Sequence, residues 1–266
     1  MNHPQPRLAR TSKSMNLALL GSGPVGLEIA RFLHESNEPL ACLIIDAKGD
    51  DKLNREIIQS AGTPPNRVYQ SDTLYTSECL TELRGLSIDL FLLSWWPYIL
   101  KRELITIPKV GCLNFHPSFL PYNRGKNYNF WTIVEDTPFG VTLHFVDEGV
   151  DSGDIAFQSR IQKSWEDTGE TLYQRAQREI VKLFKESYPA IKAGNIPRLP
   201  QDLNKGSFHR SSELDAASRI DLDKLYSARE LLNLVRARTF SPHPGVWFTD
   251  GNDKYEVRVK ITRVDK

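Results

Sequence analysis

The stretch that decides the fold is residues 16–26, NLALLGSGPVG. Its first half is a short apolar run, which predicts a buried strand. Gly21, Gly23 and Gly26 match GxGxxG where that strand would give way to a helix, and the next apolar run, residues 40–45, ends at Asp46. This pattern is typical of a dinucleotide-binding βαβ unit, with the acidic residue placed for a ribose. In a second interpretation the glycines only allow a tight turn and close helix–strand packing.

Further apolar runs continue the alternation of strands with helical patterns. Residues 88–93 and 110–114 are short and apolar, and residues 140–146 and 154–161 are β-type segments that follow them. Strands that alternate with helices predict βαβ units. We therefore expect an α/β fold, a Rossmann-like mostly parallel sheet with a small C-terminal domain that contains a β-hairpin.

Helix and turn signals divide the chain into three parts. A long helix is expected to begin at Asp167, with Asp167 and Glu170 as its capping box, and to end at Gly194. The polar, proline-bearing stretch 197–212 marks a linker. Beyond it, Ser227 and Glu230 predict a capped helix, and residues 245–261 predict a hairpin. The expected parts are a loose tail over 1–14, a Rossmann-like catalytic domain over 15–196 and a small domain over 197–266.

Composition excludes several classes of protein. Lysine plus arginine total 34 and aspartate plus glutamate 33, and a net charge of +1 argues against broad nucleic-acid binding. The three cysteines have no CxxC spacing, which disfavours a disulfide scaffold and a cysteine zinc site and fits the cytoplasm. Apolar runs fall short of the roughly 18 residues that span a bilayer, so no membrane partner is expected.

The chemistry-bearing residues follow the strand at 110–114. On an extended chain Asn114 and His116 project to the same side, and Pro117 ends the strand. Residues 147–154, DEGVDSGD, form an acidic loop whose glycines allow a sharp turn. A carboxamide for an oxyanion, an imidazole for a proton and a carboxylate to orient the imidazole are suited to acyl transfer to an amine without a covalent enzyme species.

Two other interpretations of these residues stay open. His116 can be an ordinary core histidine, with the acidic loop simply solvated. Alternatively, four side chains with nitrogen and oxygen ligands can bind zinc, although their spacing matches no fixed motif: His116, His144, Asp147 and Asp151.

The run of motifs resembles a known family. NFHPSFLP at 114–121, Arg124-Gly125, Trp131, GVTLH at 140–144 and VDSGDI at 150–155 are similar, in order, to the core of the N10-formyltetrahydrofolate-dependent formyltransferases. The resemblance implies three catalytic residues and no metal, with Asp154 in a structural role: Asn114, His116 and Asp151.

The same resemblance places folate between two loops. A flat pterin needs an apolar slot with polar groups at its edge, whereas core packing is the alternative for the aromatic residues. The folate-binding residues it implies are Trp95, Trp96, Pro97, Tyr98, Ile99, Glu148, Val150 and Asp151.

Local sequence is similar to one branch of the family, the bacterial nucleotide-sugar N-formyltransferases. Residues 122–131, YNRGKNYNFW, carry tyrosine at 128 where many relatives have proline. The implied substrate-binding residues are Asn123, Arg124, Lys126, Asn127 and Tyr128, with a turn-fixing role as the alternative for Arg124 and a solvated side chain as the alternative for Lys126.

The expected function is transfer of the formyl group of N10-formyltetrahydrofolate to the amine of a nucleotide-linked aminosugar, for O-antigen or another surface polysaccharide. The best single candidate is dTDP-4-amino-4,6-dideoxyglucose. A homodimer is expected from the resemblance. The alternatives are a methionyl-tRNA formyltransferase and, from the glycine motif with Asp46, an NAD-dependent oxidoreductase.

Overall fold

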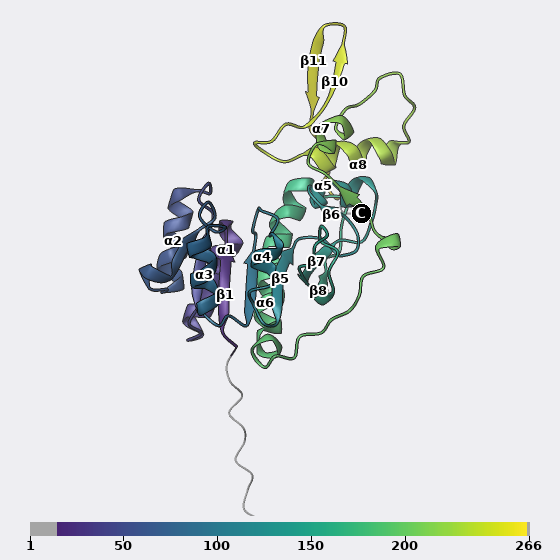
Figure 1. The fold of residues 1–266 in the computed structure, drawn as a ribbon. Coiled ribbons are helices and arrows are strands. Elements are labelled where there is room, and N and C mark those ends of the chain that lie inside the picture. Colours follow the sequence, from purple (N-terminus) through teal and green to yellow (C-terminus); the bar gives the residue numbers. More distant parts are fainter. Residues whose placement is uncertain (1–14, 265–266) are drawn as a thin grey trace, which may run out of the picture.

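The computed structural model describes residues 15–264, so the expected tail over 1–14 lies outside the described residues (Figure 1). A seven-stranded sheet with the order β3-β2-β1-β4-β5-β7-β8 forms its centre. Strands β3, β2, β1, β4 and β5 pair in parallel. β7 is antiparallel to both of its neighbours, β5 and β8, so β8 again runs in the direction of the first five. The sheet strands are β1 (Leu17–Gly21), β2 (Cys42–Ile45), β3 (Val68–Gln70), β4 (Leu90–Ser94), β5 (Gly111–His116), β7 (Gly140–Phe145) and β8 (Ile155–Arg160).

Helices cover both faces of this sheet. Side chains of alternate strand residues pack with α1, α2, α5 and α6 on one face and with α3 and α4 on the other. The Rossmann-like α/β fold is thereby confirmed. These helices are α1 (Gly23–Glu35), α2 (Asp51–Ala61), α3 (Ser77–Gly85), α4 (Arg102–Ile105), α5 (Tyr128–Val134) and α6 (Gly169–Lys192), with a short 3-10 turn, η1, over Pro65–Arg67.

The expected elements are recovered with shifted boundaries. The strand expected over 110–114 continues to His116, the residue before Pro117. The expectation that Asp167 caps the long helix is wrong: Thr168 is the N-cap, and its side chain and that of Thr171 form the capping box. Asp167 instead pairs with Arg175 at 2.8 Å. At the other end of the helix Gly194 lies just after the C-cap in the left-handed region, as expected.

The C-terminal part packs on α5 and α6 through α8 and carries a two-stranded hairpin (Figure 1). The capping box of Ser227 and Glu230 is present. Arg236 is buried and donates to the carbonyl oxygens of Ser164 and Asp167, both at 2.9 Å, which fixes this part to the loop before α6. Its elements are α7 (Glu213–Ala217), α8 (Ala228–Arg238), β10 (Val246–Asp250) and β11 (Asp253–Val257).

The stretch 197–212 is more than a connector. Leu199 bridges to Ile155 beside β8, η2 (Leu203–Lys205) follows, and β9 (Phe208–His209) pairs in parallel with β6 (Arg124–Gly125). The chain therefore crosses the end of the sheet where β5 terminates before it enters the C-terminal part. Within residues 15–264 we find no helix of the length and apolarity that crossing a membrane requires.

Candidate active site

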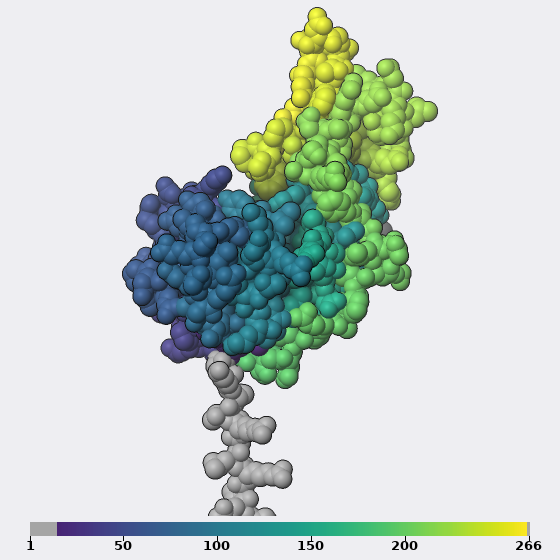
Figure 2. All heavy atoms as spheres, in the orientation of Figure 1, coloured from purple at the N-terminus to yellow at the C-terminus, as the bar shows by residue number. Residues whose placement is uncertain are grey.

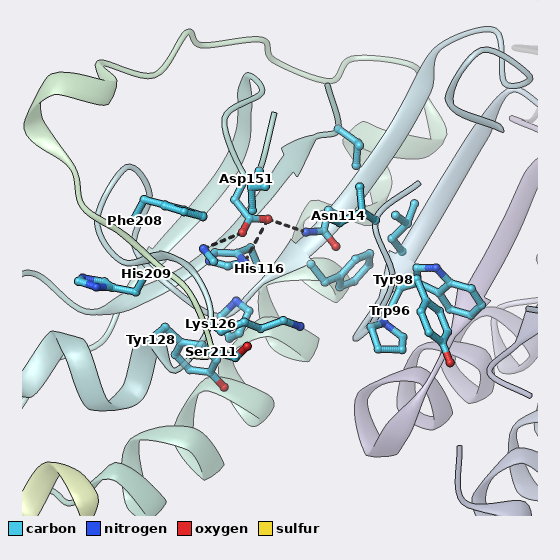
Figure 3. Close-up of a pocket in the computed structure, with 18 of the residues that line it drawn as sticks. Trp96, Tyr98, Asn114, His116, Lys126, Tyr128, Asp151, Phe208, His209 and Ser211 are labelled. Atoms are coloured by element: carbon cyan, nitrogen blue, oxygen red, sulfur yellow. Dashed lines mark hydrogen bonds and ion pairs between the residues drawn. The ribbon is translucent and has the colours of Figure 1, made fainter. Parts of the chain in front are cut away.

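A cavity of about 620 Å³ opens at the end of the sheet where β5 terminates. Parallel strands place their carboxyl ends at one edge, which is where open α/β sheets hold ligands. Residues of β5, of the loops after β4 and β7, and of 208–212 surround it. Figure 3 shows the labelled side chains in two groups on either side of Asp151: Phe208, His209, Ser211 and Tyr128 on one, and Trp96 and Tyr98 on the other.

The expected trio converges at the centre of this cavity. Asp151 Oδ1 lies 3.4 Å from His116 Nδ1 and 3.4 Å from the amide nitrogen of Asn114 (Figure 3). The other carboxylate oxygen of Asp151 accepts a hydrogen bond of 2.9 Å from the backbone N–H of Gly125. His116 is 5% exposed, and its Nε2 is buried with no hydrogen-bond partner among the described residues. One ring nitrogen thus faces a carboxylate while the other is left for a ligand.

A second buried histidine completes the cluster. His144 Nδ1 lies 2.8 Å from the carbonyl oxygen of Phe145, which only a protonated Nδ1 can satisfy. Nε2 of the neutral ring is then an acceptor, and Asn114 Nδ2 donates to it at 3.1 Å. The other N–H of the Asn114 amide is held only by the longer contact with Asp151. His144 therefore orients the carboxamide and leaves it one weakly held donor.

Electrostatics separate the roles of His116 and Asp151. Burial lowers the pKa of His116 below its ordinary value of 6.5 and outweighs the Asp151 carboxylate and the Asn123 backbone, which act in the opposite direction, so the neutral imidazole is favoured at neutral pH. Burial alone would raise the pKa of Asp151. The neighbouring His116 and the Gly125 N–H, which donates to the carboxylate, outweigh it and hold that pKa well below its ordinary value. The site is thus set as an ionised carboxylate beside a neutral base.

Unusual backbone conformations build this geometry. Trp95, Asn123, Asn127 and Asp151 have φ between +50° and +59°, a region that non-glycine residues enter rarely. Such conformations persist where the surrounding structure enforces them, and they gather at functional sites. At Asp151 the reversal turns the carboxylate back to the end of β5.

The glycine-rich turn is filled by the chain itself. Ser22 N–H donates to the carbonyl oxygen of Ser94 at 3.0 Å, and a Cβ built on Gly23 would lie 3.5 Å from the Trp95 ring. The Asp46 carboxylate, expected at a ribose in the dinucleotide interpretation, accepts instead from the Tyr98 hydroxyl at 2.7 Å. A Cβ on Gly26 would lie 3.0 Å from the backbone of Gly21, so the packing interpretation of the glycines fits this turn better.

The loop after β4 supplies most of the expected folate residues. Trp95, Trp96, Pro97, Tyr98 and Ile99 line the cavity, as do Val150 and Asp151. Trp96 is 9% exposed with an unpartnered indole nitrogen, whereas Ile99 is 77% and Val150 37% exposed. This side thus offers an apolar slot with one unsatisfied donor. Glu148 is absent from the lining. Its side chain is exposed and lies 3.7 Å from Arg102.

The residues expected to bind the substrate fall into two groups, those that line the cavity and those that do not. Lys126, Asn127 and Tyr128 line the cavity, and the Tyr128 hydroxyl is buried without a hydrogen-bond partner in the described structure. Asn123 and Arg124 are not among the lining residues. Asn123 is 1% exposed, and its side chain is bonded to Glu135, Ser207 and Thr137. The Arg124 guanidinium lies 5.9 Å from the ring of Phe208, in keeping with the turn-fixing alternative.

Sequence reasoning gave several lining residues no place in the transfer site and considered His144 only as a zinc ligand. His144, Tyr173 and residues 208–212 all line the cavity. His144 could have been identified as a site residue from the sequence. It lies two positions after Thr142, in a buried strand beside the strand that carries Asn114 and His116. Residues 208–212 fall in the stretch expected to be a linker, and their place in the cavity wall depends on the pairing of β9 with a strand 84 residues earlier.

Three of the four residues considered as zinc ligands lie close together in the structure. Nitrogen and oxygen atoms of His116, His144 and Asp151 lie within 4.8 Å of one another. Asp147 points elsewhere, since its carboxylate accepts from Gly149 N–H and the Ser152 hydroxyl. The Asn114 amide directs an N–H into the same space, which disfavours a cation there.

Family models identify the class of protein. Residues 29–187 match the model described as formyl transferase, and residues 213–263 match the model of the N-formyltransferase dimerization C-terminal domain. The first match covers more than half of the chain. The chain therefore belongs to the formyltransferase family.

Individual relatives agree with this assignment. A methionyl-tRNA formyltransferase from Methylacidiphilum infernorum is 31% identical over 183 residues, which are 68% of this chain and 56% of the relative. The chain thus spans little more than half the length of the curated relatives it matches.

Solved structures share the fold. A 4-N formyltransferase from Francisella tularensis superposes with a TM-score of 0.78 at 22% identity, over 94% of this chain and 99% of that one. A formyltransferase from Anoxybacillus kamchatkensis, solved with UDP-4,6-dideoxy-4-formamido-L-AltNAc and tetrahydrofolate, has a TM-score of 0.54 at 25% identity, over 82% of this chain and 97% of that one.

Proposed function

We propose that this protein transfers the formyl group of N10-formyltetrahydrofolate to the amine of a nucleotide-linked aminosugar. The single observation that carries the proposal is the convergence of Asn114, His116 and Asp151, with the buried Nε2 of His116 left unpartnered in the cavity. A neutral base next to an ionised carboxylate and an amide donor is the equipment for acyl transfer to an amine.

His116, Asp151 and Asn114 each have a separate role in the proposed reaction. When bound, N10-formyltetrahydrofolate supplies the formyl carbon, whose bond to N10 breaks as its bond to the acceptor nitrogen forms. His116 Nε2 takes the proton of the attacking amine and returns it to the leaving nitrogen. Asp151, 3.4 Å from Nδ1, holds the ring with Nδ1 protonated. Asn114 donates its second amide N–H to the oxygen on which negative charge develops.

The folate is assigned to the side of the cavity formed by residues 94–100 and 146–150. The slot there is apolar at Ile99 and Val150 and offers the free indole N–H of Trp96. A flat heterocycle suits such a slot, because its faces pack on apolar atoms and its edge takes the hydrogen bond. The structure of the Anoxybacillus relative with tetrahydrofolate supports this choice of co-substrate.

The acceptor is assigned to the opposite side, where Lys126, Asn127 and Tyr128 lie. Nucleotide sugars are favoured because the structurally similar Francisella protein is a 4-N formyltransferase and the Anoxybacillus relative was solved with a UDP-linked formamido sugar. We take dTDP-4-amino-4,6-dideoxyglucose as the first candidate, with surface polysaccharide as its destination and the cytoplasm as the compartment. The three buried cysteines, none of which forms a disulfide, fit a reducing compartment.

We also propose a homodimer formed through the C-terminal part. The hairpin β10–β11 stands out from the rest of the molecule (Figure 2), and its family model is that of a dimerization domain. Tyr255 on this hairpin is 46% exposed and stacks on Phe248. Light scattering at two protein concentrations tests the dimer.

The test of the activity is a formyl-transfer screen. The full chain is incubated with N10-formyltetrahydrofolate and a panel of dTDP-, UDP- and GDP-linked 3-amino and 4-amino sugars, and products are read by mass. A gain of one formyl group on one panel member supports the proposal. Absence of any product from an active folate-binding preparation contradicts it.

A methionyl-tRNA formyltransferase is the second candidate, favoured by the 31% identity to that class. It shares the chemistry and differs in the acceptor. The net charge of +1 offers little attraction for a polyanion. Charged initiator tRNA at low salt is therefore the matched arm of the same screen, and its formylation in preference to every sugar would select this alternative.

A further inference from the structure

Residues 198–201, which we name the clamp, lie against the acidic loop that carries Asp151. None of them is among the residues that line the cavity, and the proposed function gives them no role. The backbone of Leu199 pairs with that of Ile155 through two hydrogen bonds of 2.8 and 3.0 Å. The clamp thus pairs with the chain at the point where the acidic loop enters β8.

Arg198 ties one end of the clamp to the sheet. Its guanidinium donates to the carbonyl oxygen of Val110 at 2.7 Å and lies 3.5 Å from the centre of the Phe145 ring. The Asp154 carboxylate at the end of the acidic loop is 3.9 Å away. Arg198 therefore contacts the chain before β5, at the end of β7 and before β8, which fixes the position of the clamp.

Gln201 at the other end of the clamp donates to the acidic loop. Its Nε2 lies 3.0 Å from the carbonyl oxygen of Asp151 and 2.6 Å from that of Gly153. A primary amide has two N–H donors, so each of them has one of these oxygens as its acceptor. Within residues 15–264 no other donor reaches either oxygen. Gln201 is half-buried although its neighbours from 197 to 205 are exposed, so its amide faces the loop and not the solvent.

Asp151 lies where the acidic loop changes from exposed to packed. On one side the Glu148 side chain is 78% exposed. On the other side a Cβ built on Gly153 would lie 2.0 Å from the carbonyl oxygen of Phe145, so the loop is packed on the end of β7. Asp151 itself has a φ of +50°. The two bonds from Gln201 thus hold the backbone at this transition.

The position of the Asp151 carboxylate depends on that backbone. Its contacts with His116 and Asn114 are both 3.4 Å long, whereas N–H···O hydrogen bonds are about 2.7–3.2 Å. The bond from the Gly125 N–H, at 2.9 Å, is the short one. A small rotation of the Asp151 backbone would therefore move the carboxylate away from the His116 ring.

We infer that Gln201 is a positioning residue, which holds the backbone of the acidic loop so that the Asp151 carboxylate stays beside His116. The inference rests on the proposed function, in which Asp151 supports His116, and extends it to a residue outside the cavity. A purely structural amide is the alternative, which would stabilise the loop and leave the reaction unaffected. The two differ in what a variant does to kcat.

Steady-state kinetics of the full chain without the amide donor test this directly. Gln201→Met keeps the length of the side chain and loses both N–H groups, so kcat should fall about tenfold while both KM values stay within about twofold. Asn16→Leu is the matched control, because the Asn16 amide also donates to two backbone carbonyl oxygens away from the cavity, those of Leu86 at 2.8 Å and Ser87 at 3.3 Å. Its kcat should be normal. Turnover is expressed per site titrated with 5-formyltetrahydrofolate, so that unfolded protein does not contribute.

Two further variants separate positioning from a general effect. Gln201→Glu keeps the shape and places a carboxylate against the two carbonyl oxygens at neutral pH, so it should lower kcat at least as much as Gln201→Met. In an Asp151→Asn background Gln201→Met should lower kcat by less than about twofold, because the carboxylate that Gln201 positions is already gone. A further loss of about tenfold in that background overturns the inference.

The His116 imidazole reports the position of Asp151 without turnover. The titratable groups that face this ring belong to Asp151, Lys126, Tyr128 and His144. The Asp151 charge raises the pKa of His116 against the effect of burial, so NMR titration should show a lower pKa in Gln201→Met and an unchanged one in Asn16→Leu. The inference requires both this shift and the loss of kcat, and either one without the other overturns it. If the wild-type protein formylates no acceptor, the proposed function fails, and in that case the pKa shift alone decides the inference.

Discussion

Two strand ends at the same edge of the sheet differ in this molecule: side chains of the protein fill the end of β1, whereas the end of β5 opens into the cavity. β1 ends in the glycine-rich turn with Asp46 nearby, and β5 ends in Asn114 and His116. Side chains of the loop after β4 fill the first, where Tyr98 satisfies Asp46 and Trp95 covers Gly23. The second keeps a buried His116 Nε2 without a partner in the described structure.

The difference teaches that an unpartnered buried base beside an ionised carboxylate marks a site better than a glycine motif does. Buried polar groups are nearly always hydrogen-bonded, so one that is not requires an explanation. GxGxxG is a solution to close packing at β1, where Gly26 lies against the backbone of Gly21. At β5 the unpartnered nitrogen is explained by a ligand. The following predictions test this contrast, from the largest expected effect to the smallest.

Replacing the base should have the largest effect on turnover. His116→Asn should lower kcat about 10³-fold with the melting temperature nearly unchanged, because the proton of the amine loses its acceptor. Asp46→Asn at the other strand end is the control and should leave kcat within about twofold, because Asp46 bonds to protein groups. Comparable losses in both variants would remove the distinction between the two ends.

Replacing the orienting carboxylate should have the next largest effect. Asp151→Asn should lower kcat about 10²-fold while substrate KM values change little, since the variant loses the charge that supports His116 during proton transfer. Steady-state kinetics with both substrates varied separates the two constants. A variant with normal kcat would show that Asp151 only shapes its loop.

The pH profile should reveal the buried base. Because burial lowers the pKa of His116, the ring stays neutral as the pH falls below 6.5, and kcat/KM should decline tenfold per unit only below that lowered pKa. The value of kcat/KM falls on acidification because protonation of His116 removes the base. Rates between pH 4.5 and 8.5 in constant ionic strength provide the test, and a limb centred at or above pH 7 would contradict the burial argument.

Adding a side chain at Gly26 should lower the stability of the protein and leave its turnover unchanged. The new Cβ of Gly26→Val meets the Gly21 backbone at 3.0–3.2 Å, so we expect a loss of about 1–3 kcal/mol in the free energy of unfolding. Denaturant titration measures it. The folded fraction should keep a normal kcat, whereas a stable but inactive variant would indicate that the turn takes part in the reaction.

The smallest effect is expected where Tyr98 fills the first strand end. Tyr98→Phe removes its 2.7 Å bond to Asp46 and should cost about 0.5–1.5 kcal/mol of stability. NADH should still fail to bind, because the Trp95 ring remains over Gly23. Fluorescence titration of the variant checks this, and NADH binding gained by the variant would mean that the hydroxyl alone closes a dinucleotide site.

Local sequence signals predicted much of this molecule. The strands at 16–20 and 140–146, the capping box at Ser227 and the meeting of Asn114 with His116 depend on periodicity and short-range chemistry, which the chain carries in neighbouring residues. The 114–116 pair is the clearest case, since strand alternation alone puts both side chains on one face.

The remaining features depend on contacts between distant segments. Trp95 and Tyr98 fill the GxGxxG turn from a distant part of the sequence. Tyr98, for example, bonds to Asp46, which lies 52 positions earlier. Residues 208 and 209 are held at the cavity by a two-residue pairing with residues 124 and 125, which the linker interpretation of 197–212 did not include. Aspartate tolerates the left-handed conformation seen at Asp151, but the contacts that hold its carboxylate, with Gly125 and His116, come from other segments of the chain.

The most direct measurement compares ligands for the two strand ends in one protein. Calorimetric titration of the full chain with 5-formyltetrahydrofolate, a stable analogue of the co-substrate, and separately with NADH asks which end accepts a ligand. We predict saturable 1:1 binding of the folate that is weakened by Trp96→Ala, and no binding of NADH. Saturable NADH binding together with no heat from the folate would contradict the assignment of the active site to the end of β5.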